Sequence, residues 1–220
     1  MGLSVDFRAG ATAFADSVEA LLRAVAELSE YDLLGSSRCH GWSRLDVVVH
    51  VIAGWQEMLG GLVSPVASAP TVDAASYWTA FSADFGDDDP VATLMSQRRR
   101  TAPYARPADA VAQLRDVAEA VLRGVRSLPN AHLRWQGHVF TAGDYLAVWA
   151  VEDVVHHLDL LVTEPAPASA LGLARASIEA LAGAPLPASW NDVDATLIGT
   201  GRVPVPADAG PLSDRLPVLG

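Results

Sequence analysis

The stretch that decides the fold is Ala150-Val-Glu-Asp-Val-Val-His-His-Leu-Asp159. It belongs to a segment, residues 141–163, in which apolar residues recur with the spacing of a buried helix. Glu152 and His156 are four residues apart, so a helix places them on one face, one turn apart. A carboxylate and an imidazole are costly to bury unless something pairs them. A divalent metal would pair them, because ionised Glu and neutral His are both natural ligands.

Three further segments, residues 5–29, 43–61 and 108–128, also carry apolar residues at intervals of three and four. The second begins with Ser43 and Asp46, which form a capping-box pattern with an acid at the fourth position. The spacing therefore predicts an all-α core. We expect a four-helix bundle with long crossover connections between its helices.

The remaining segments are predicted less sharply. Proline residues 165 and 167 mark a boundary, so we expect a metal-binding bundle in residues 1–164 and an extension packed on it in residues 165–220. The extension is predicted to be small and α/β or irregular, with a helix at 169–181 and a short strand within 195–205. Residues 64–107 have no assigned role.

Within residues 64–107 the pattern suggests two short helices. Tyr77, Trp78, Phe81 and Phe85 indicate the first. The run Asp87-Asp-Asp-Pro90 is a candidate cap for the second, which would end in Arg98-Arg-Arg100.

Composition limits the classes of partner. The chain has 220 residues, half of them hydrophobic, and a formal net charge of −11, which argues against nucleic acid and anionic membranes. Its single cysteine allows no internal disulfide, and neither a signal peptide nor a membrane span is evident. We expect a cytoplasmic protein, as a monomer or homodimer, that acts on small molecules.

His50 is the best candidate for a third metal ligand. It lies in the middle of a predicted helix between β-branched apolar residues and is expected to be buried. A histidine on an apolar face is, taken alone, usually a core residue with a hydrogen-bond partner. With Glu152 and His156 on another buried helix, two histidines and a carboxylate form the set used by zinc sites that keep an open coordination position.

Two motifs and the tail resemble one known family. The motifs are Cys39-His-Gly-Trp-Ser-Arg-Leu-Asp-Val-Val-Val-His50 and Thr141-Ala-Gly-Asp-Tyr-Leu-Ala-Val-Trp-Ala-Val-Glu-Asp-Val-Val-His-His-Leu-Asp-Leu160. The tail segments are Leu197-Ile-Gly-Thr-Gly-Arg202 and Arg215-Leu-Pro-Val-Leu-Gly220. Together they resemble the mycothiol-dependent maleylpyruvate isomerase family of the DinB-like helical-bundle superfamily. The resemblance does not extend to residues 64–107.

The resemblance implies that His50, Glu152 and His156 bind a divalent metal, usually zinc, and that the co-substrate is a low-molecular-weight thiol such as mycothiol. We expect an enzyme that isomerises a small electrophilic substrate or transfers the thiol to it. A non-catalytic, metal-stabilised binding or stress-response module remains an alternative. So does a thiol-independent lyase, epimerase or cyclase, because one fold carries many activities.

Neighbouring polar residues have two interpretations each. Asp46 could accept the free ring N–H of His50 or serve only as the helix cap. Asp159 could orient His156 or His157. His157 itself is expected to be structural, because adjacent residues point about 100° apart around a helix.

Candidates for binding an anionic substrate are two arginines. Family members use an arginine in the middle of the chain for a substrate carboxylate, which makes Arg100 a candidate, although a solvated helix end explains Arg98-Arg-Arg100 more simply. Arg202 follows two glycines that would let an anion approach the backbone, although a simple turn would also explain them. Cys39 is more typical of buried packing than of a nucleophile.

Overall fold

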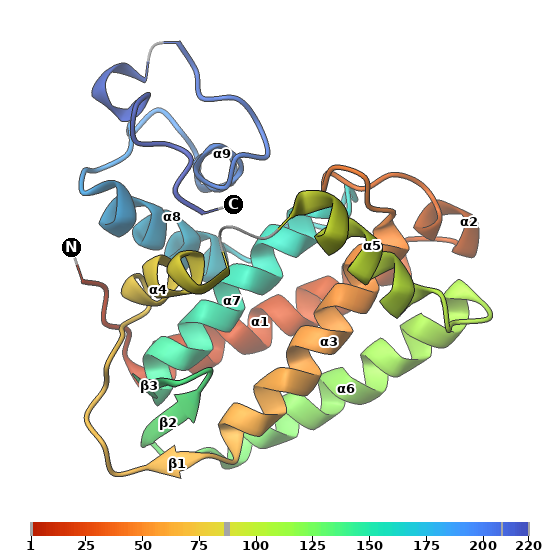
Figure 1. Ribbon diagram of the computed structural model, residues 1–220, viewed down its shortest axis with the longest axis horizontal. Coiled ribbons are helices and arrows are strands. Elements are labelled where there is room, and N and C mark those ends of the chain that lie inside the picture. Colours follow the sequence, from red (N-terminus) through yellow and green to blue (C-terminus); the bar gives the residue numbers. More distant parts are fainter. Residues whose placement is uncertain (1, 86–88, 208, 220) are drawn as a thin grey trace.

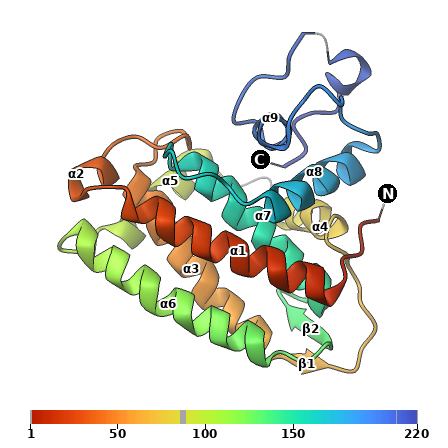
Figure 2. The same cartoon turned by 180° about the vertical axis from the view of Figure 1, so that it is seen from behind.

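The computed structural model describes residues 2–85, 89–207 and 209–219 of the chain. Four long helices lie side by side and form the bundle (Figure 1). They are α1 (Phe7–Ala26), α3 (Arg44–Leu62), α6 (Pro107–Ser127) and α7 (Ala142–Asp159). The view from behind shows α1 and α6 together on one side of the bundle (Figure 2). The predicted helical core is therefore confirmed.

Local capping explains where two of these helices begin. At α3, Ser43 and Asp46 form the predicted capping box, in which each side chain accepts the other's backbone N–H. At α7, the hydroxyl of Thr141 accepts the N–H of Asp144. The Asp144 carboxylate in turn accepts the N–H of Val5, at 2.7 Å, and so ties the N-terminal segment to the start of α7.

Several boundaries differ from those predicted. The first helix is shorter than the predicted segment 5–29, because α1 spans Phe7–Ala26. A four-residue helix that was not predicted, α2 (Glu30–Leu33), follows Ser29 with a capping box of its own. Helix α7 ends at Asp159 rather than at residue 163. Leu161 adopts a left-handed backbone conformation (φ 57°), which the helix cannot continue through.

The expected short strand within residues 195–205 is wrong. That region forms α9 (Asp192–Gly199), which follows α8 (Ala168–Ala182). Asn191 caps α9 by accepting the N–H of Asp194, and this local start signal outweighs the β-branched residues that suggested a strand. A 3₁₀ turn, Gly210–Leu212, follows.

The structure also contains a small antiparallel sheet that was not predicted from the sequence. It consists of β1 (Pro65–Val66), β2 (His132–Trp135) and β3 (His138–Thr141), in the order β1-β2-β3. Residues Gln136 and Gly137 make the tight turn of the β2–β3 hairpin, with positive φ angles of 46° and 80°. The hairpin connects α6 to α7, and β3 ends at Thr141, the residue that caps α7.

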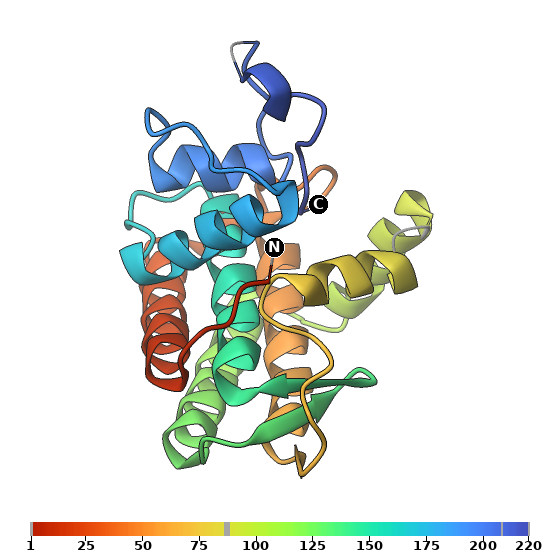
Figure 3. The ribbon, with the colours of Figure 1, turned by 90° about the vertical axis from the view of Figure 1, so that its left-hand side faces the viewer.

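Helices α4 (Ser76–Phe85) and α5 (Pro90–Thr101) are the two short helices expected in the middle of the chain. Asp89 caps α5, whereas Asp87 and Asp88 lie outside the described residues. In the side view, α3 and α7 lie between α1 and these two short helices, and α8 and α9 lie above the bundle (Figure 3). Among the described residues, no helix is long and apolar enough to cross a membrane.

The N-terminal ends of α1 and α7 approach each other at two glycines. A Cβ atom on Gly143 would lie 2.1 Å from the carbonyl oxygen of Val5, and one on Gly10 would lie 2.5 Å from the carbonyl oxygen of Gly143. Such backbone contacts leave no room for a side chain. The close approach buries α7 between its neighbours.

Gly143→Ala is therefore expected to lower the free energy of unfolding by about 1–3 kcal/mol, the usual cost of overpacking a core. Urea denaturation measures the change. Gly172→Ala is the matched control, because that helical glycine has open space around its Cβ position. Replacing it should be neutral or stabilising by up to ~1 kcal/mol, since alanine has the better helix propensity. Equal effects of the two substitutions would contradict the proposed close contact.

Candidate metal centre

The structure brings His50, Glu152 and His156 together. His50 comes from the middle of α3, and the other two come from successive turns of α7. Their ligating atoms all lie within 4.8 Å of one another. Oε1 of Glu152 lies 3.3 Å from Nε2 of His50 and 3.2 Å from Nε2 of His156.

The spacing of these atoms fits a metal ion. Zinc binds nitrogen and oxygen at about 2.0–2.2 Å, so two ligands of a tetrahedral site lie about 3.4 Å apart. The distances from Glu152 to the two histidines agree with that value. The donor set, two imidazoles and one carboxylate, suits zinc and several other divalent ions.

One side of this cluster is exposed. The side chains of His50 and Glu152 are 31% and 32% exposed, whereas that of His156 is only 7% exposed. The prediction that His50 is buried was therefore only partly correct, because α3 turns this residue toward a pocket beneath α5. A metal held here would have protein on one side and a free position on the other.

The electrostatics favour the forms that bind metal at two of the three positions. Burial raises the pKa of Glu152, but hydrogen bonds from His156 and His50 outweigh this effect and hold the pKa well below its usual range. Burial also lowers the pKa of His50, which keeps that ring neutral. For His156, burial would lower the pKa, but hydrogen bonds with Asp159, Cys39 and Glu152 raise it well above the usual value.

Asp159 forms a hydrogen bond with His156 rather than with His157. Its Oδ2 lies 3.1 Å from Nδ1 of His156, and the carboxylate is fully buried. Cys39 and Arg202 also reach this carboxylate, from the loop before α3 and from the segment after α9. Burial would raise the pKa of Asp159, but hydrogen bonding and attraction to His156 and Arg202 lower it to about 2.

His157 points elsewhere. Its Nε2 donates a 2.8 Å hydrogen bond to the carbonyl oxygen of Glu164, which holds the chain just after α7. His157 thus has the structural role expected from its position one residue beyond a ligand candidate.

Asp46 is engaged in capping α3. Its Oδ2 accepts hydrogen bonds from the N–H and hydroxyl of Ser43, and its Oδ1 accepts one from the hydroxyl of Thr101 at 2.7 Å. Of the two roles considered for Asp46, the structure shows the helix cap and not a hydrogen bond to His50. The contact with Thr101 also fastens the end of α5 to the start of α3.

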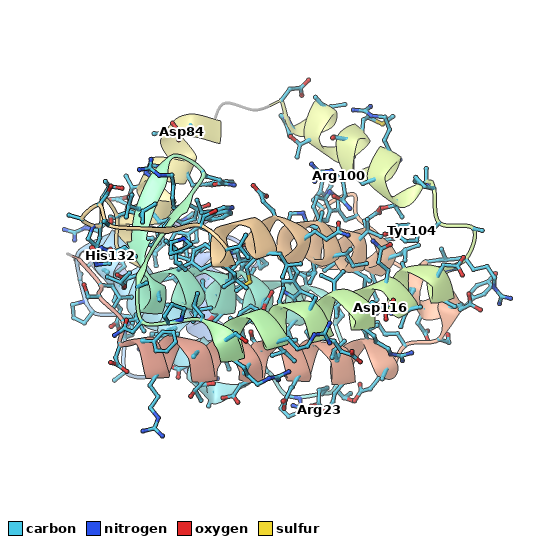
Figure 4. All side chains as sticks on the ribbon, turned by 90° about the horizontal axis from the view of Figure 1, so that it is seen from below. Arg23, Asp84, Arg100, Tyr104, Asp116 and His132 are labelled. Atoms are coloured by element: carbon cyan, nitrogen blue, oxygen red, sulfur yellow. The ribbon has the colours of Figure 1, made fainter. Side chains whose placement is uncertain are left out.

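A pocket of about 440 Å³ reaches the cluster at His50. His50 forms part of its wall, together with Trp42, Gln97, Arg99 and Arg100. The Trp42 ring lies 5.2 Å from the His50 ring. Figure 4 shows Arg100 on the side of α5 that faces α3, and its positive charge helps to lower the pKa of His50. Arg100 therefore remains a candidate for binding an anionic substrate.

The other two candidate residues have different positions. Cys39 is half-buried, and it lines a second pocket of about 570 Å³ that shares Trp42 with the first. Its Sγ lies 3.0 Å from Oδ2 of Asp159, so the thiol is a hydrogen-bonding group as well as a packed one. Arg202 is already engaged by Asp159 and does not line either of these pockets.

Asp153 is a buried acid for which no role was predicted from the sequence. It accepts hydrogen bonds from the indole N–H of Trp55, at 2.9 Å, and from the hydroxyl of Ser17, at 3.0 Å. Burial raises its pKa to about 7. Its place beside Glu152 in an apolar helix is a signal in the sequence. Its partners on α3 and α1 are visible only in the folded chain.

Comparison with known proteins places the chain in a family. Residues 14–161 match the family described as the mycothiol maleylpyruvate isomerase N-terminal domain, and the chain belongs to it. No curated protein matches the chain significantly. Two crystal structures, of the mycothiol-dependent maleylpyruvate isomerase and of a histidine-to-alanine mutant, are similar at 14% and 13% identity. Both have a TM-score of 0.56 and cover 79% of this chain and 70% of theirs, which shows a shared fold.

Trp55→Phe is expected to destabilise the protein by about 1–3 kcal/mol beyond the loss of ring size, because it leaves the buried Asp153 carboxyl without one partner. Urea denaturation measures the loss. Trp135→Phe is the matched control, since the indole N–H of this buried tryptophan has no hydrogen-bond partner among the described residues. If both substitutions cost the same, the Trp55–Asp153 hydrogen bond contributes nothing.

Proposed function

We propose that this member of the mycothiol maleylpyruvate isomerase N-terminal domain family is a metal-dependent enzyme that uses a low-molecular-weight thiol. It would isomerise a small electrophilic substrate or transfer the thiol to it. The observation that carries the proposal is the His50, Glu152 and His156 cluster, in which His50 also lines a pocket. A mycothiol-like thiol is the expected co-substrate, because the similar crystal structures are of a mycothiol-dependent enzyme.

The residues present would hold a divalent metal, with zinc as the first expectation. When bound, such a metal would keep a thiol in its thiolate form, which is the reactive nucleophile. Glu152 is ionised and His50 neutral, so both are ready to serve as ligands. Asp159 accepts the Nδ1 proton of His156 and so directs the Nε2 lone pair toward the cluster.

The pocket supplies binding groups for the substrate. Arg99 and Arg100 line it, in a chain whose net charge is −11, so they provide local positive charge where an anionic group could bind. Trp42 forms an apolar wall beside His50. We infer that a small electrophile carrying a carboxylate fits this combination.

For isomerisation, the thiolate sulfur would add to one carbon of a conjugated cis double bond. The C=C bond becomes a single bond as the electron pair moves onto the substrate's oxygen, where the guanidinium of Arg100 can stabilise it. Rotation about the single bond and expulsion of the thiolate then restore the double bond in the trans form. The thiol is regenerated, and the net reaction consumes no oxidant, reductant or proton. For S-transfer, the adduct would instead be protonated and released.

A non-catalytic, metal-stabilised module is the alternative from another class. It would require a closed site in which the protein supplies every ligand. The partial exposure of His50 and Glu152, together with the place of His50 in the wall of a pocket, favours an open, catalytic site instead. A thiol-independent lyase, epimerase or cyclase would share the open site but not the response to thiols.

The purified protein is expected to contain about one equivalent of a divalent metal, as measured by elemental analysis, because the three ligands lie at suitable distances. His50→Ala and His156→Ala should each abolish it. His132→Ala is the matched control, because that histidine lies on β2 and bonds the carbonyl of Ser68. Wild-type protein that is isolated metal-free and also fails to bind added zinc would overturn the ligand assignment.

Mycothiol is expected to stabilise the metal-loaded protein in a thermal-shift assay. A ligand at 100 times its Kd stabilises the folded state by ~2.7 kcal/mol, which shifts the melting temperature by several degrees. The metal-free protein and His50→Ala should not respond. Absence of any shift for the metal-loaded wild type with mycothiol or other small thiols would favour a thiol-independent function.

A further inference from the structure

We propose that Arg202 is a positioning residue of the metal centre, which acts through Asp159 to fix the ring of His156. The segment after α9 would then complete a site whose ligands all lie on the bundle. The inference rests on the proposed function in one respect, namely that His156 is a metal ligand.

A continuous chain of hydrogen bonds connects the three residues. Arg202 donates two hydrogen bonds to Asp159, with Nε 3.3 Å from Oδ1 and Nη2 3.2 Å from Oδ2. Oδ2 of Asp159 in turn lies 3.1 Å from Nδ1 of His156. The Asp159 side chain is completely buried, and that of Arg202 is 20% exposed. Charge-assisted, two-point contacts of this kind fix both distance and orientation.

The backbone after α9 places the guanidinium in advance. Gly201 has a positive φ of 70°, a conformation that favours glycine, and it turns the chain at the end of the helix. The N–H of Arg202 then donates to the carbonyl of Leu197 at 2.8 Å. Nη1 of Arg202 donates to the carbonyl of Thr200 at 3.1 Å. The arginine is therefore held by its own segment as well as by Asp159.

The helix that precedes Arg202 is itself held by the last residues of the chain and by α8. The N–H groups of Val218 and Leu219 both donate to the carbonyl of Gly199, at 2.9 and 3.1 Å. Gly199 also packs so closely on Ile178 of α8 that a Cβ atom there would lie 2.5 Å from it. The position of Arg202 thus depends on how α9 and the last residues pack on α8.

Three groups share the Asp159 carboxylate, so its orientation depends on Arg202. Cys39 lies 3.0 Å from Oδ2, the same oxygen that binds His156 and Arg202. A buried carboxylate that loses its guanidinium is left with a poorly compensated charge and can turn toward other donors. Arg202 holds the plane of the carboxylate through both of its oxygens, so that Oδ2 remains in line with Nδ1 of His156.

The experiment compares zinc affinity in wild type, Arg202→Ala and Arg202→Lys by competition with a coloured chelator. Loss of a group that supports a metal ligand typically costs 10–100-fold in affinity, and we expect that loss for Arg202→Ala. Arg202→Lys should fall between the two, because lysine keeps the charge but lacks the planar two-point fork. Wild-type affinity in both variants would overturn the proposal.

Arg215→Ala is the matched control. Arg215 belongs to the same extension and bonds the carbonyl of Ala182, away from the metal centre. Its replacement should lower the free energy of unfolding without changing zinc affinity. If Arg215→Ala and Arg202→Ala weaken zinc binding equally, Arg202 serves only to attach the extension, and the proposal fails.

Two spectroscopic measurements report on the ring itself. The visible absorption bands of the cobalt-substituted protein, which are sensitive to ligand geometry, should change in Arg202→Ala and not in Arg215→Ala. In metal-free protein, the hydrogen-bonded Nδ1 proton of His156 should give a protected NMR signal in wild type that exchanges faster in Arg202→Ala. If Arg202→Ala does not fold, the same measurements on Arg202→Lys decide between the outcomes, and an unchanged signal overturns the positioning role.

The two proposals fail in different ways. Wild-type protein that binds no zinc overturns the metal centre, and the protected Nδ1 proton then still shows whether Arg202 orients the ring. Wild-type protein that binds zinc alongside an Arg202→Ala variant with unchanged affinity, cobalt spectrum and proton exchange overturns only the positioning role.

Discussion

The structure depends on one constraint: α7 carries several ionisable side chains through the centre of the protein, and each of them must be paired. Glu152 meets His50 of α3, and Asp153 meets Ser17 of α1 and Trp55 of α3. An unpaired buried charge or polar group would cost several kcal/mol, comparable to a large part of the stability of a domain. These pairings therefore specify which neighbours α7 must have, in addition to what apolar packing requires.

The same constraint creates the candidate site. Where α3 and α7 face each other below α5, one carboxylate is shared by two imidazoles. About a third of the His50 and Glu152 side chains remains exposed, and His50 forms part of the wall of a pocket. A fully closed arrangement would have given a structural site. The pocket between the bundle and α5, lined by Arg100 and Trp42, is where the proposed function would place a substrate. The chain's family membership is shown by its sequence, whereas the proposed reaction rests on the groups that line the pocket.

Local patterns predicted most of the helices, because a helix needs only spacing and caps. Ser43 and Thr141 start α3 and α7 as their sequences indicate. The mistakes arise where signals compete over a few residues. The Asn191 cap produced α9 in a region that contains β-branched residues, and the two-residue turn at Gln136–Gly137 produced a hairpin that the short strands alone did not reveal. Helix α7 ended early at a left-handed residue that carries no distinctive sequence signal.

The sequence by itself determined that Glu152 and His156 lie on one face, because an interval of four residues on a helix leaves no other result. It also supplied His50 as a candidate ligand of suitable chemistry. Only the tertiary structure decided that His50, 102 positions before Glu152, faces it, and that Asp159 pairs with His156 and is held by Arg202. The physical reason is range: helix geometry fixes neighbours within one segment, whereas contacts between segments depend on how close their backbones can pack.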